Sequence, residues 1–189
     1  MKVFSIFGYT KSGKTTTAEY VIAELRRRGY SVGSVKDIHF EQFTIETEGS
    51  NTDRHKKAGA QLVTARGLKE TDILLQERLP LHKLLDVYEC LYAFDYVVLE
   101  GENEFCGPGI VCGKNLEEAD RKWDGAQIDV FALSGVASVG LQTHRGVPAI
   151  DATTDAERLA DLIETHAVSW ESLRERQKEA DRTAVIHFD

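Results

Sequence analysis

A phosphate-binding loop near the N-terminus constrains the fold of this chain more than any other feature. Residues 8–15 read GYTKSGKT and fit the pattern G-x-x-x-x-G-K-[ST]. The glycines of this pattern let backbone N–H groups surround a β-phosphate, the lysine reaches the β- and γ-phosphates, and the hydroxyl residue can ligate Mg²⁺. Such a loop connects a strand to a helix. Residues 3–7 read as a buried strand, and the apolar residues between 18 and 25 share one helical face, so the helix N-terminus would point at the phosphates.

The loop supplies most of the candidate nucleotide-binding residues. They are Gly8, Thr10, Lys11, Ser12, Gly13, Lys14, Thr15 and Thr16. Lys14 is also a candidate catalytic residue, because its charge can hold the leaving phosphates, and Thr15 is a candidate Mg²⁺ ligand. An accidental glycine-rich turn is the alternative interpretation, and the predicted strand and helix on either side argue against it.

Residues 96–101, YVVLEG, contain the second informative feature. Apolar residues that end in an acid are typical of a buried parallel strand, which here delivers Glu100 to its carboxyl end. In a P-loop protein a carboxylate at this position holds Mg²⁺ directly or through water, or orients a hydrolytic water. Glu100 is therefore a candidate metal ligand and catalytic residue, and a surface carboxylate at a strand end is the alternative.

The strand predicted at residues 31–36 leads into Asp37, Ile38 and His39. Ligands of open α/β sheets bind outside the carboxyl ends of the strands, so this segment lies where function is expected. Lys36 and His39 are candidate nucleotide-binding residues, and Asp37 is a candidate catalytic residue. An ordinary loop carboxylate and a surface imidazole are the alternatives for Asp37 and His39.

Residues 41–51 are polar and predict a mobile loop, and mobile loops near a nucleotide often act as switch segments ordered by the γ-phosphate and Mg²⁺. A short charged helix with Thr52 as its N-cap follows, and β-like runs at 61–66 and 70–76 predict a hairpin. Arg54 of the short helix is the best candidate for an arginine that reaches the phosphates in cis. A solvated arginine is the alternative.

Further strands and helices alternate along the rest of the chain. The predicted strands are residues 96–101, a strand ending at 112, 128–133 and 147–150, and the predicted helices begin at Pro80, at residue 114 and at a capping box formed by residues 154–157. The predicted fold class is an α/β P-loop NTPase with a mostly parallel central sheet flanked by helices, plus a small β-hairpin excursion.

At 189 residues the chain fits one domain of ordinary size, and no second independent domain is expected. We expect a P-loop nucleotide-binding domain at residues 1–168, followed at residues 169–189 by a charged C-terminal helical extension and a short terminal strand. Residues 174–182 are almost wholly charged, which predicts a solvated helix, and the terminal strand is predicted at residues 185–188.

The net charge of −8 argues against nucleic acid and anionic membranes as partners, because both bind basic surfaces. The N-terminus enters a strand without a signal segment and no run of eighteen apolar residues exists, which predicts a cytoplasmic protein. The three cysteines are an odd count without a C-x-x-C pair, which favours reduced thiols. The spacing of Cys106 and Cys112 matches no common zinc pattern, so both are expected to be buried apolar residues.

These motifs together resemble those of the molybdopterin-guanine dinucleotide biosynthesis protein B (MobB) family, over about residues 2–165. Proteins of that family carry a G-x-x-x-S-G-K-T-T loop, which Gly8 to Thr16 match. Their motif D-S-x-R-H-x-x-A-G-A resembles residues 51–60, NTDRHKKAGA, and is the most family-specific match. Their V-E-G element resembles residues 99–101, and the proline that precedes their next strand resembles Pro108.

The chain also departs from the family pattern. In the K-H-x-H-H cluster of the family, Lys36 and His39 match while Asp37 and Phe40 differ. Asn103 stands where the family has a basic residue after V-E-G.

The resemblance implies a GTP-binding protein with weak GTPase activity that uses Mg²⁺. It also implies a homodimer that acts as an adapter beside the molybdopterin guanylyltransferase, which attaches GMP to molybdopterin. The residues themselves indicate a nucleoside triphosphate but do not identify its base, because the chain lacks the N-K-x-D tetrapeptide of many guanine-binding loops. Residues 133–135 follow a core strand where such a loop could lie. The preference for GTP over ATP therefore rests on the resemblance.

Three other functions stay open. A P-loop small-molecule kinase that uses ATP would employ Asp37 as the base for an acceptor hydroxyl, but no Arg-rich stretch that could form a lid lies between the core strands. A nickel-type metallochaperone GTPase shares the loop, but the His-rich segment or Cys-Pro-His motif of those proteins is missing. The third function is non-enzymatic: nucleotide binding without turnover fixes a shape of the protein that a partner binds.

Overall fold

The computed structural model describes residues 1–39, 43–102 and 104–185, which fall into two compact units. The first unit combines Met1–Asp37 with Leu81–Asp189 and carries the central sheet. The second unit, Ile38–Pro80, contains a short helix and a hairpin. No helix within these described ranges is both long enough and apolar enough to cross a membrane.

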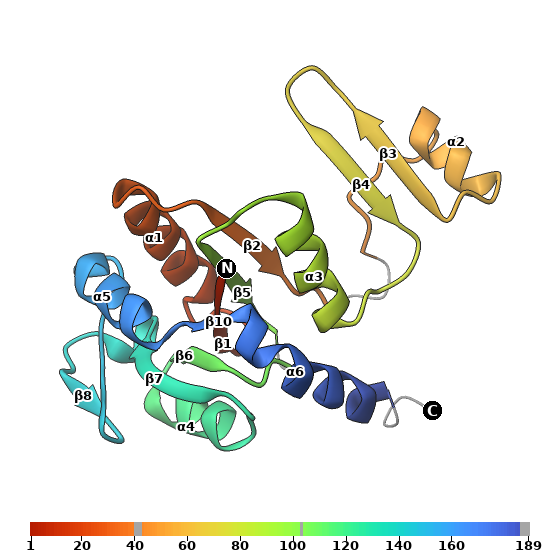
Figure 1. Ribbon diagram of the computed structural model, residues 1–189. Helices are drawn as coiled ribbons and strands as arrows, with labels where there is room; N and C mark the ends of the chain where they lie inside the picture. The colour runs from red at the N-terminus through yellow and green to blue at the C-terminus, as the bar shows by residue number, and fades with distance from the viewer. Residues whose placement is uncertain (40–42, 103, 186–189) are drawn as a thin grey trace. The chain divides into compact units, whose positions relative to one another are not determined.

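Parallel strands form the central sheet of the first unit, in the order β2-β5-β1-β6-β7 (Figure 1). They are β2 (Val32–Lys36), β5 (Tyr96–Glu100), β1 (Lys2–Gly8), β6 (Pro108–Cys112) and β7 (Asp129–Ser134). The inner strands are almost wholly buried, as expected of parallel strands that are covered on both faces. A short strand, β10 (Val168–Ser169), pairs antiparallel with the start of β1. The prediction of a mostly parallel sheet flanked by helices is confirmed.

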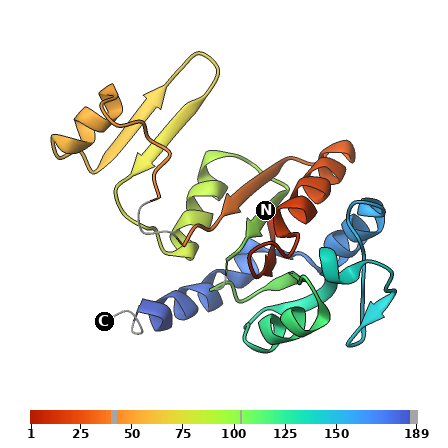
Figure 2. The ribbon, with the colours of Figure 1, turned by 180° about the vertical axis from the view of Figure 1, so that it is seen from behind.

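Helices cover both faces of this sheet (Figures 1 and 2). They are α1 (Lys14–Arg27), α3 (Leu81–Leu91), α4 (Leu116–Asp124), α5 (Ala156–His166) and α6 (Trp170–Val185). Alternate side chains of β1 point to opposite faces, with Phe4 and Ile6 on one and Val3 and Phe7 on the other. The first pair packs under α1 and α5, and the second pair packs under α3, α6 and α4. The parallel strands end at one common edge, where the phosphate-binding loop and Glu100 are found.

An ion-pair network joins the end of α1 to α5. Glu24 accepts hydrogen bonds from Arg27 Nε at 2.6 Å and from Arg28 Nε at 2.7 Å. Arg28 Nη1 also donates to Asp161 Oδ1 and Glu164 Oε1, both at 2.8 Å. The hydrogen bonds from Arg27 and Arg28 lower the pKa of Glu24 to about 2. The network therefore depends on an ionised Glu24.

Replacement of Glu24 by glutamine is expected to make the free energy of unfolding less sensitive to acid. The pKa of Glu24 is lower in the folded chain than its ordinary value of 4.5. Ionised Glu24 therefore stabilises the fold above that value, and the contribution is lost as the pH falls toward 2. Urea unfolding at pH 7 and pH 3 measures the effect, with Glu19→Gln, at an exposed position of the same helix, as the control. An acid-induced loss of stability equal to that of the wild type would contradict the role of Glu24.

The segment after β7 differs from the strand predicted at residues 147–150. Strand β9 (Val147–Pro148) instead pairs antiparallel with β8 (Thr143–His144). The next residue, Ala149, meets the central sheet through an isolated parallel bridge to Leu133. The prediction of a core strand along the whole segment is wrong, because the turn before Val147 directs it into the hairpin and Pro148 has no N–H to donate to a ladder.

The C-terminal helix α6 is less solvated than its charged sequence predicts. Trp170, Leu173, Gln177 and Asp181 are all buried. Gln177 Oε1 accepts from the backbone N–H of Cys106 at 3.1 Å, and Gln177 Nε2 donates to Asp181 Oδ1 at 2.8 Å. The prediction of a solvated helix is therefore wrong for this face, where Gln177 satisfies backbone groups of the segment between β5 and β6. The predicted terminal strand lies outside the described residues, apart from residue 185, the last residue of α6.

The second unit contains α2 (Asn51–Lys57) and an antiparallel hairpin of β3 (Leu62–Arg66) and β4 (Thr71–Leu75). The predicted hairpin excursion is confirmed. Part of the predicted switch loop, residues 41 and 42, lies outside the described residues.

Two helix caps differ from the predicted ones by one or two residues. The N-cap of α2 is Ser50, whose Oγ accepts from Asp53 N at 3.1 Å, because the predicted cap, Thr52, lies inside the helix and its hydroxyl contacts Ser50. The N-cap of α5 is Asp155, because the hydroxyl of Thr154 donates to the carbonyl of Asp151 instead.

Candidate functional site

The phosphate-binding loop lies between β1, at the centre of the sheet, and α1. Gly13 is the N-cap of α1 and has φ +94°, a left-handed conformation that favours glycine. A glycine cap has no side chain to accept the first N–H groups of the helix, which leaves them for an anion. The loop thus has the strand-loop-helix context that the sequence predicts for it.

Close backbone contacts make two glycines of this site indispensable. A Cβ atom on Gly8 would lie 2.2 Å from the carbonyl oxygen of Cys112, and a Cβ atom on Gly135 would lie 2.1 Å from the carbonyl oxygen of Ser12. The same carbonyl of Ser12 accepts a hydrogen bond from Val136 N at 3.2 Å. The loop that follows β7 therefore supports the phosphate-binding loop from one side.

Lys14 is held over its own loop. Its Nζ donates to the carbonyl oxygen of Tyr9 at 2.7 Å. Burial lowers the pKa of Lys14, and the nearby charges of Lys36 and Lys122 act in the same direction, whereas Glu100 opposes them. The Nζ group thus lies against the backbone of its own loop.

Three side chains contact one another at the edge of the sheet, those of Thr15, Lys36 and Glu100. Thr15 Oγ1 donates to Glu100 Oε1 at 2.5 Å, and Lys36 Nζ donates to the same oxygen. Lys36 Nζ also lies 3.3 Å from Thr15 Oγ1. The strand register explains the contact, since Glu100 of β5 pairs with Ile6 of β1 on one side and with Lys36 of β2 on the other.

The hydroxyl of Thr15 and the carboxylate of Glu100 fit a magnesium ion. Mg²⁺ binds oxygen ligands and is usually held by one or two protein groups together with phosphates and water. Two such oxygens, brought together from α1 and β5, stand next to the phosphate-binding loop. The residues predicted as metal ligands are therefore in contact with each other.

A buried hydroxyl group in the loop has no partner of its own. Ser12 is fully buried, and its Oγ makes no hydrogen bond within the part of the chain that the structure describes. Buried polar groups are nearly always hydrogen-bonded, so such an exception needs an explanation. A bound phosphate could supply the missing acceptor.

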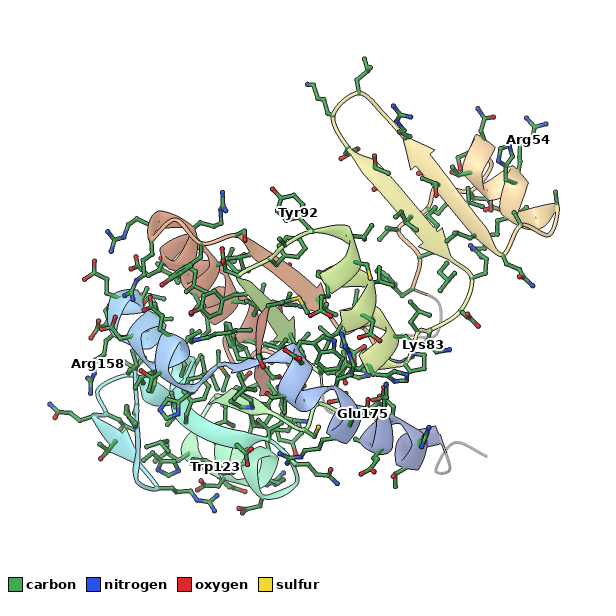
Figure 3. The ribbon with its side chains drawn as sticks, viewed as in Figure 1. Arg54, Lys83, Tyr92, Trp123, Arg158 and Glu175 are labelled. Atoms are coloured by element: carbon green, nitrogen blue, oxygen red, sulfur yellow. The ribbon has the colours of Figure 1, made fainter. Side chains whose placement is uncertain are left out.

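The structure brings most of the predicted site residues into the first unit. The residues of the loop, Lys36, Asp37 and Glu100 all belong to it, and the backbone N–H of Asp37 donates to the carbonyl of Glu100 at 2.9 Å. His39 and Arg54 belong to the second unit, where Arg54 projects from α2 (Figure 3). The roles predicted for His39 and Arg54 stay predictions, and Phe40 and Asn103 lie outside the described residues.

One residue near the site, Lys122, could not be identified from the sequence. Lys122 of α4 places its Nζ 5.4 Å from the centre of the Tyr9 ring, so a lysine from another helix approaches the loop. Burial lowers the pKa of Lys122. No sequence signal could have identified this contact, because it depends on how α4 packs against the loop.

Two of the free cysteines are buried, and one of them, Cys112, lies beside Gly8 of the phosphate-binding loop. Cys106 and Cys112 are buried, as expected, and burial raises the pKa of Cys112 to about 12. This thiol therefore stays protonated at neutral pH and behaves as a small apolar residue beside the loop.

A parallel sheet whose central strand leads through a phosphate-binding loop into a helix defines an α/β protein of the P-loop NTPase class. The family model described as molybdopterin guanine dinucleotide synthesis protein B matches residues 3–134. The chain belongs to this family, MobB.

Individual relatives agree with this assignment. The chain is 24% identical over 151 residues to a probable molybdopterin-guanine dinucleotide biosynthesis adapter protein of Bacillus subtilis, which covers 79% of this chain and 85% of the relative. A relative of similar name from Methanocaldococcus jannaschii is 29% identical over 104 residues, which are 55% of this chain and 42% of the relative.

Solved structures share the fold. The crystal structure of Bacillus subtilis MobB superposes with a TM-score of 0.70 at 21% identity and covers 89% of this chain and 99% of that one. A MobB homologue from Bacillus stearothermophilus superposes with a TM-score of 0.65 at 24% identity and covers 87% and 97% of the two chains.

Proposed function

We propose that this chain is an adapter in molybdopterin guanine dinucleotide biosynthesis that binds GTP with Mg²⁺ and hydrolyses it slowly. The observation that carries the nucleotide-binding part is the contact of Thr15 with Glu100, at 2.5 Å, beside a phosphate-binding loop. Membership of the MobB family supports the pathway.

Different groups of the site would bind the phosphates and the metal ion. Backbone N–H groups at the start of α1 and the Nζ of Lys14 would bind the phosphates, and Thr15 and Glu100 would hold Mg²⁺. The metal ion, when bound, would neutralise charge that develops on the phosphates. Glu100 could also orient the attacking water, and Asp37 follows the strand next to it.

A slow reaction fits the charges at the site. Catalysis of phosphoryl transfer is mainly positioning and charge stabilisation, and an arginine that reaches the phosphates is worth about 10³–10⁵ in rate. The first unit brings the charges of Lys14, Lys36 and Lys122 together here, and Arg121, which lines a pocket with Tyr9 and Thr10, is paired with Glu117 at 2.7 Å. Arg54, in the second unit, is our candidate for the arginine, and its engagement by a partner would accelerate the reaction.

We further propose that the chain acts as a homodimer beside the molybdopterin guanylyltransferase, in the cytoplasm. Exposed apolar side chains on the hairpin of the second unit support a protein partner. Leu62 and Leu75 are cross-strand neighbours that are 54% and 36% exposed, and Ile73 is 52% exposed. Apolar side chains gathered on a small unit favour a protein interface.

A competition titration of GTP against ATP, on the purified protein with Mg²⁺, tests the proposal. We expect GTP to bind at least about tenfold more tightly, a difference of about 1.4 kcal/mol in binding free energy. A preference for ATP would contradict the adapter function and favour a small-molecule kinase, in which Asp37 would accept the proton of the acceptor hydroxyl.

A further inference from the structure

We propose that Lys36 is a resident counter-ion of the metal site: in the nucleotide-free protein its ammonium group contacts the oxygens of both Thr15 and Glu100, and a divalent cation that binds these oxygens must displace it. The inference rests on the proposed function, because it concerns the same nucleotide site. It adds a condition for metal binding, namely that Lys36 must first leave Glu100.

The contacts of Lys36 are those that a metal ion would make. Its Nζ donates to Glu100 Oε1 and lies 3.3 Å from Thr15 Oγ1, so it contacts the carboxylate and the hydroxyl at once. These are the two oxygens predicted to ligate Mg²⁺. An ammonium group and a divalent cation cannot both occupy the same side of these oxygens, since their like charges repel.

The burial of Glu100 explains why a cation is needed there at all times. The residue is 8% exposed and sits at the end of a strand that is buried along its whole length. A carboxylate taken out of water is costly unless it is paired with a positive charge and hydrogen-bonded. Thr15 donates one hydrogen bond, and Lys36 supplies the charge.

Lys36 can leave this position without disturbing the sheet. Its side chain is 54% exposed, in contrast to 10% for Glu100. Its backbone is fixed at the end of β2, an edge strand of the sheet, where it pairs with Glu100. Movement of the flexible four-carbon side chain is therefore enough to vacate the site. The phosphates of an incoming nucleotide would offer the displaced ammonium a new anionic partner.

The arrangement makes metal binding conditional on the nucleotide. Without phosphates, a metal ion has to break the ion pair of Lys36 and receives two protein ligands in return. With phosphates, the displaced lysine regains an ion pair and the metal gains further oxygen ligands. Lys36 would thereby keep the free protein from holding divalent cations and reserve the site for the metal-nucleotide complex.

Titration of nucleotide-free protein with Mn²⁺, followed by electron paramagnetic resonance, tests the proposal on wild type, Lys36→Met and a matched control. Methionine keeps most of the length of the side chain and removes its charge. The control is Lys83→Met, because Lys83 is an exposed lysine of α3 in the same unit (Figure 3). We expect Lys36→Met to bind Mn²⁺ about tenfold more tightly than the other two proteins, because no charged hydrogen bond has to be broken first. Glu100→Gln in the Lys36→Met background should abolish that gain.

Thermal unfolding gives a second readout that does not depend on turnover. In EDTA, Lys36→Met is expected to have a lower Tm than wild type, because Glu100 has lost its counter-ion, and Mg²⁺ should restore most of the difference. A loss of Tm that Mg²⁺ does not restore would indicate a purely structural lysine and overturn the proposal. Mn²⁺ affinity that is equal in wild type and Lys36→Met, or weaker in the variant, would overturn it as well.

Different outcomes would contradict the proposed function and the role of Lys36. If wild type binds neither GTP nor ATP, the proposed function is wrong. If it binds GTP with Mg²⁺ while Lys36→Met leaves Mn²⁺ binding unchanged, the nucleotide site stands and the role of Lys36 as counter-ion is wrong.

Discussion

Replacement of Lys14 by alanine is expected to weaken GTP binding by about 100-fold or more while the protein stays folded. A charged hydrogen bond to phosphate contributes about 1.5–3 kcal/mol, and Lys14 is expected to reach two phosphates, so the loss amounts to roughly 3 kcal/mol. Within the loop, the amino group donates to the carbonyl of Tyr9, a hydrogen bond exposed to water. Its loss should therefore cost little stability.

Isothermal titration calorimetry with GTP and Mg²⁺ measures the affinity, and urea unfolding shows that the variant is folded. Lys83→Ala serves as the control, because it removes a lysine of the same unit on the exposed surface of α3. An unchanged Kd in a folded Lys14→Ala protein would refute the assignment of residues 8–15 as the phosphate-binding loop.

Replacement of Gly135 by alanine is expected to damage both the fold and the nucleotide site from outside the loop. Gly135 has φ +71° and ψ −158°, a region that essentially glycine alone adopts, and its Cβ would lie 2.1 Å from the carbonyl oxygen of Ser12. Backbone strain and overpacking together should lower the free energy of unfolding by about 2–5 kcal/mol. Because the displaced carbonyl belongs to the phosphate-binding loop, GTP affinity should fall at least about tenfold in the protein that remains folded.

The control for this experiment is Gly140→Ala. Gly140 also has a positive φ, +77°, but a Cβ at that position would meet nothing within 4 Å in the described structure. Both variants thus place alanine at a positive φ, and the difference between them reports the special backbone conformation of Gly135 together with its contact with Ser12. Equal losses of stability and of GTP affinity in the two variants, measured by urea unfolding and calorimetry, would contradict a supporting role for the loop after β7.

The central sheet and the phosphate-binding loop could be predicted because each is encoded in consecutive residues. The strand at residues 3–7 and the strand ending at Glu100 are continuous apolar runs, and buried parallel strands need no other pattern. The phosphate-binding loop, which lies between the first strand and α1, is recognised by a motif with a physical mechanism. For the same reason the hairpin at residues 61–76 was predicted correctly.

Contacts between elements that are distant in sequence could not be predicted in this way. The ion pair of Lys36 with Glu100 depends on the register of two parallel strands, which the sequence does not state. The approach of Lys122 to Tyr9 depends on the packing of α4. Both arise from the tertiary arrangement of strands and helices and not from a local sequence pattern.

The polar residues of the C-terminal helix show a second reason why burial could not be predicted from the sequence. Gln177 and Asp181 lie in an almost wholly charged stretch, and composition alone indicates that they face water. Gln177 is buried because it completes hydrogen bonds of the segment between β5 and β6, and Asp181 is buried because it accepts from Gln177 and from the backbone N–H of His82 in α3. These needs appear only when the segment and α3 are in place. A polar residue can thus belong to the interior through the backbone groups that it satisfies.

The antiparallel pairing of β1 with β10 means that the central sheet cannot be completed on the ribosome until Ser169 has been translated. Lys2 pairs with Ser169, and the backbone N–H of Trp170 donates to the carbonyl of Met1 at 2.9 Å. At the usual 5–20 residues per second, the first strand emerges roughly ten to thirty seconds before this partner is translated. The neighbours of β1 in the sheet, β5 and β6, are also translated after the second unit. The phosphate-binding loop is therefore translated well before the residues that support it, since Glu100, Cys112 and Gly135 all follow it in the chain. A nascent chain would gain the ability to bind a nucleotide only after Gly135 has been translated.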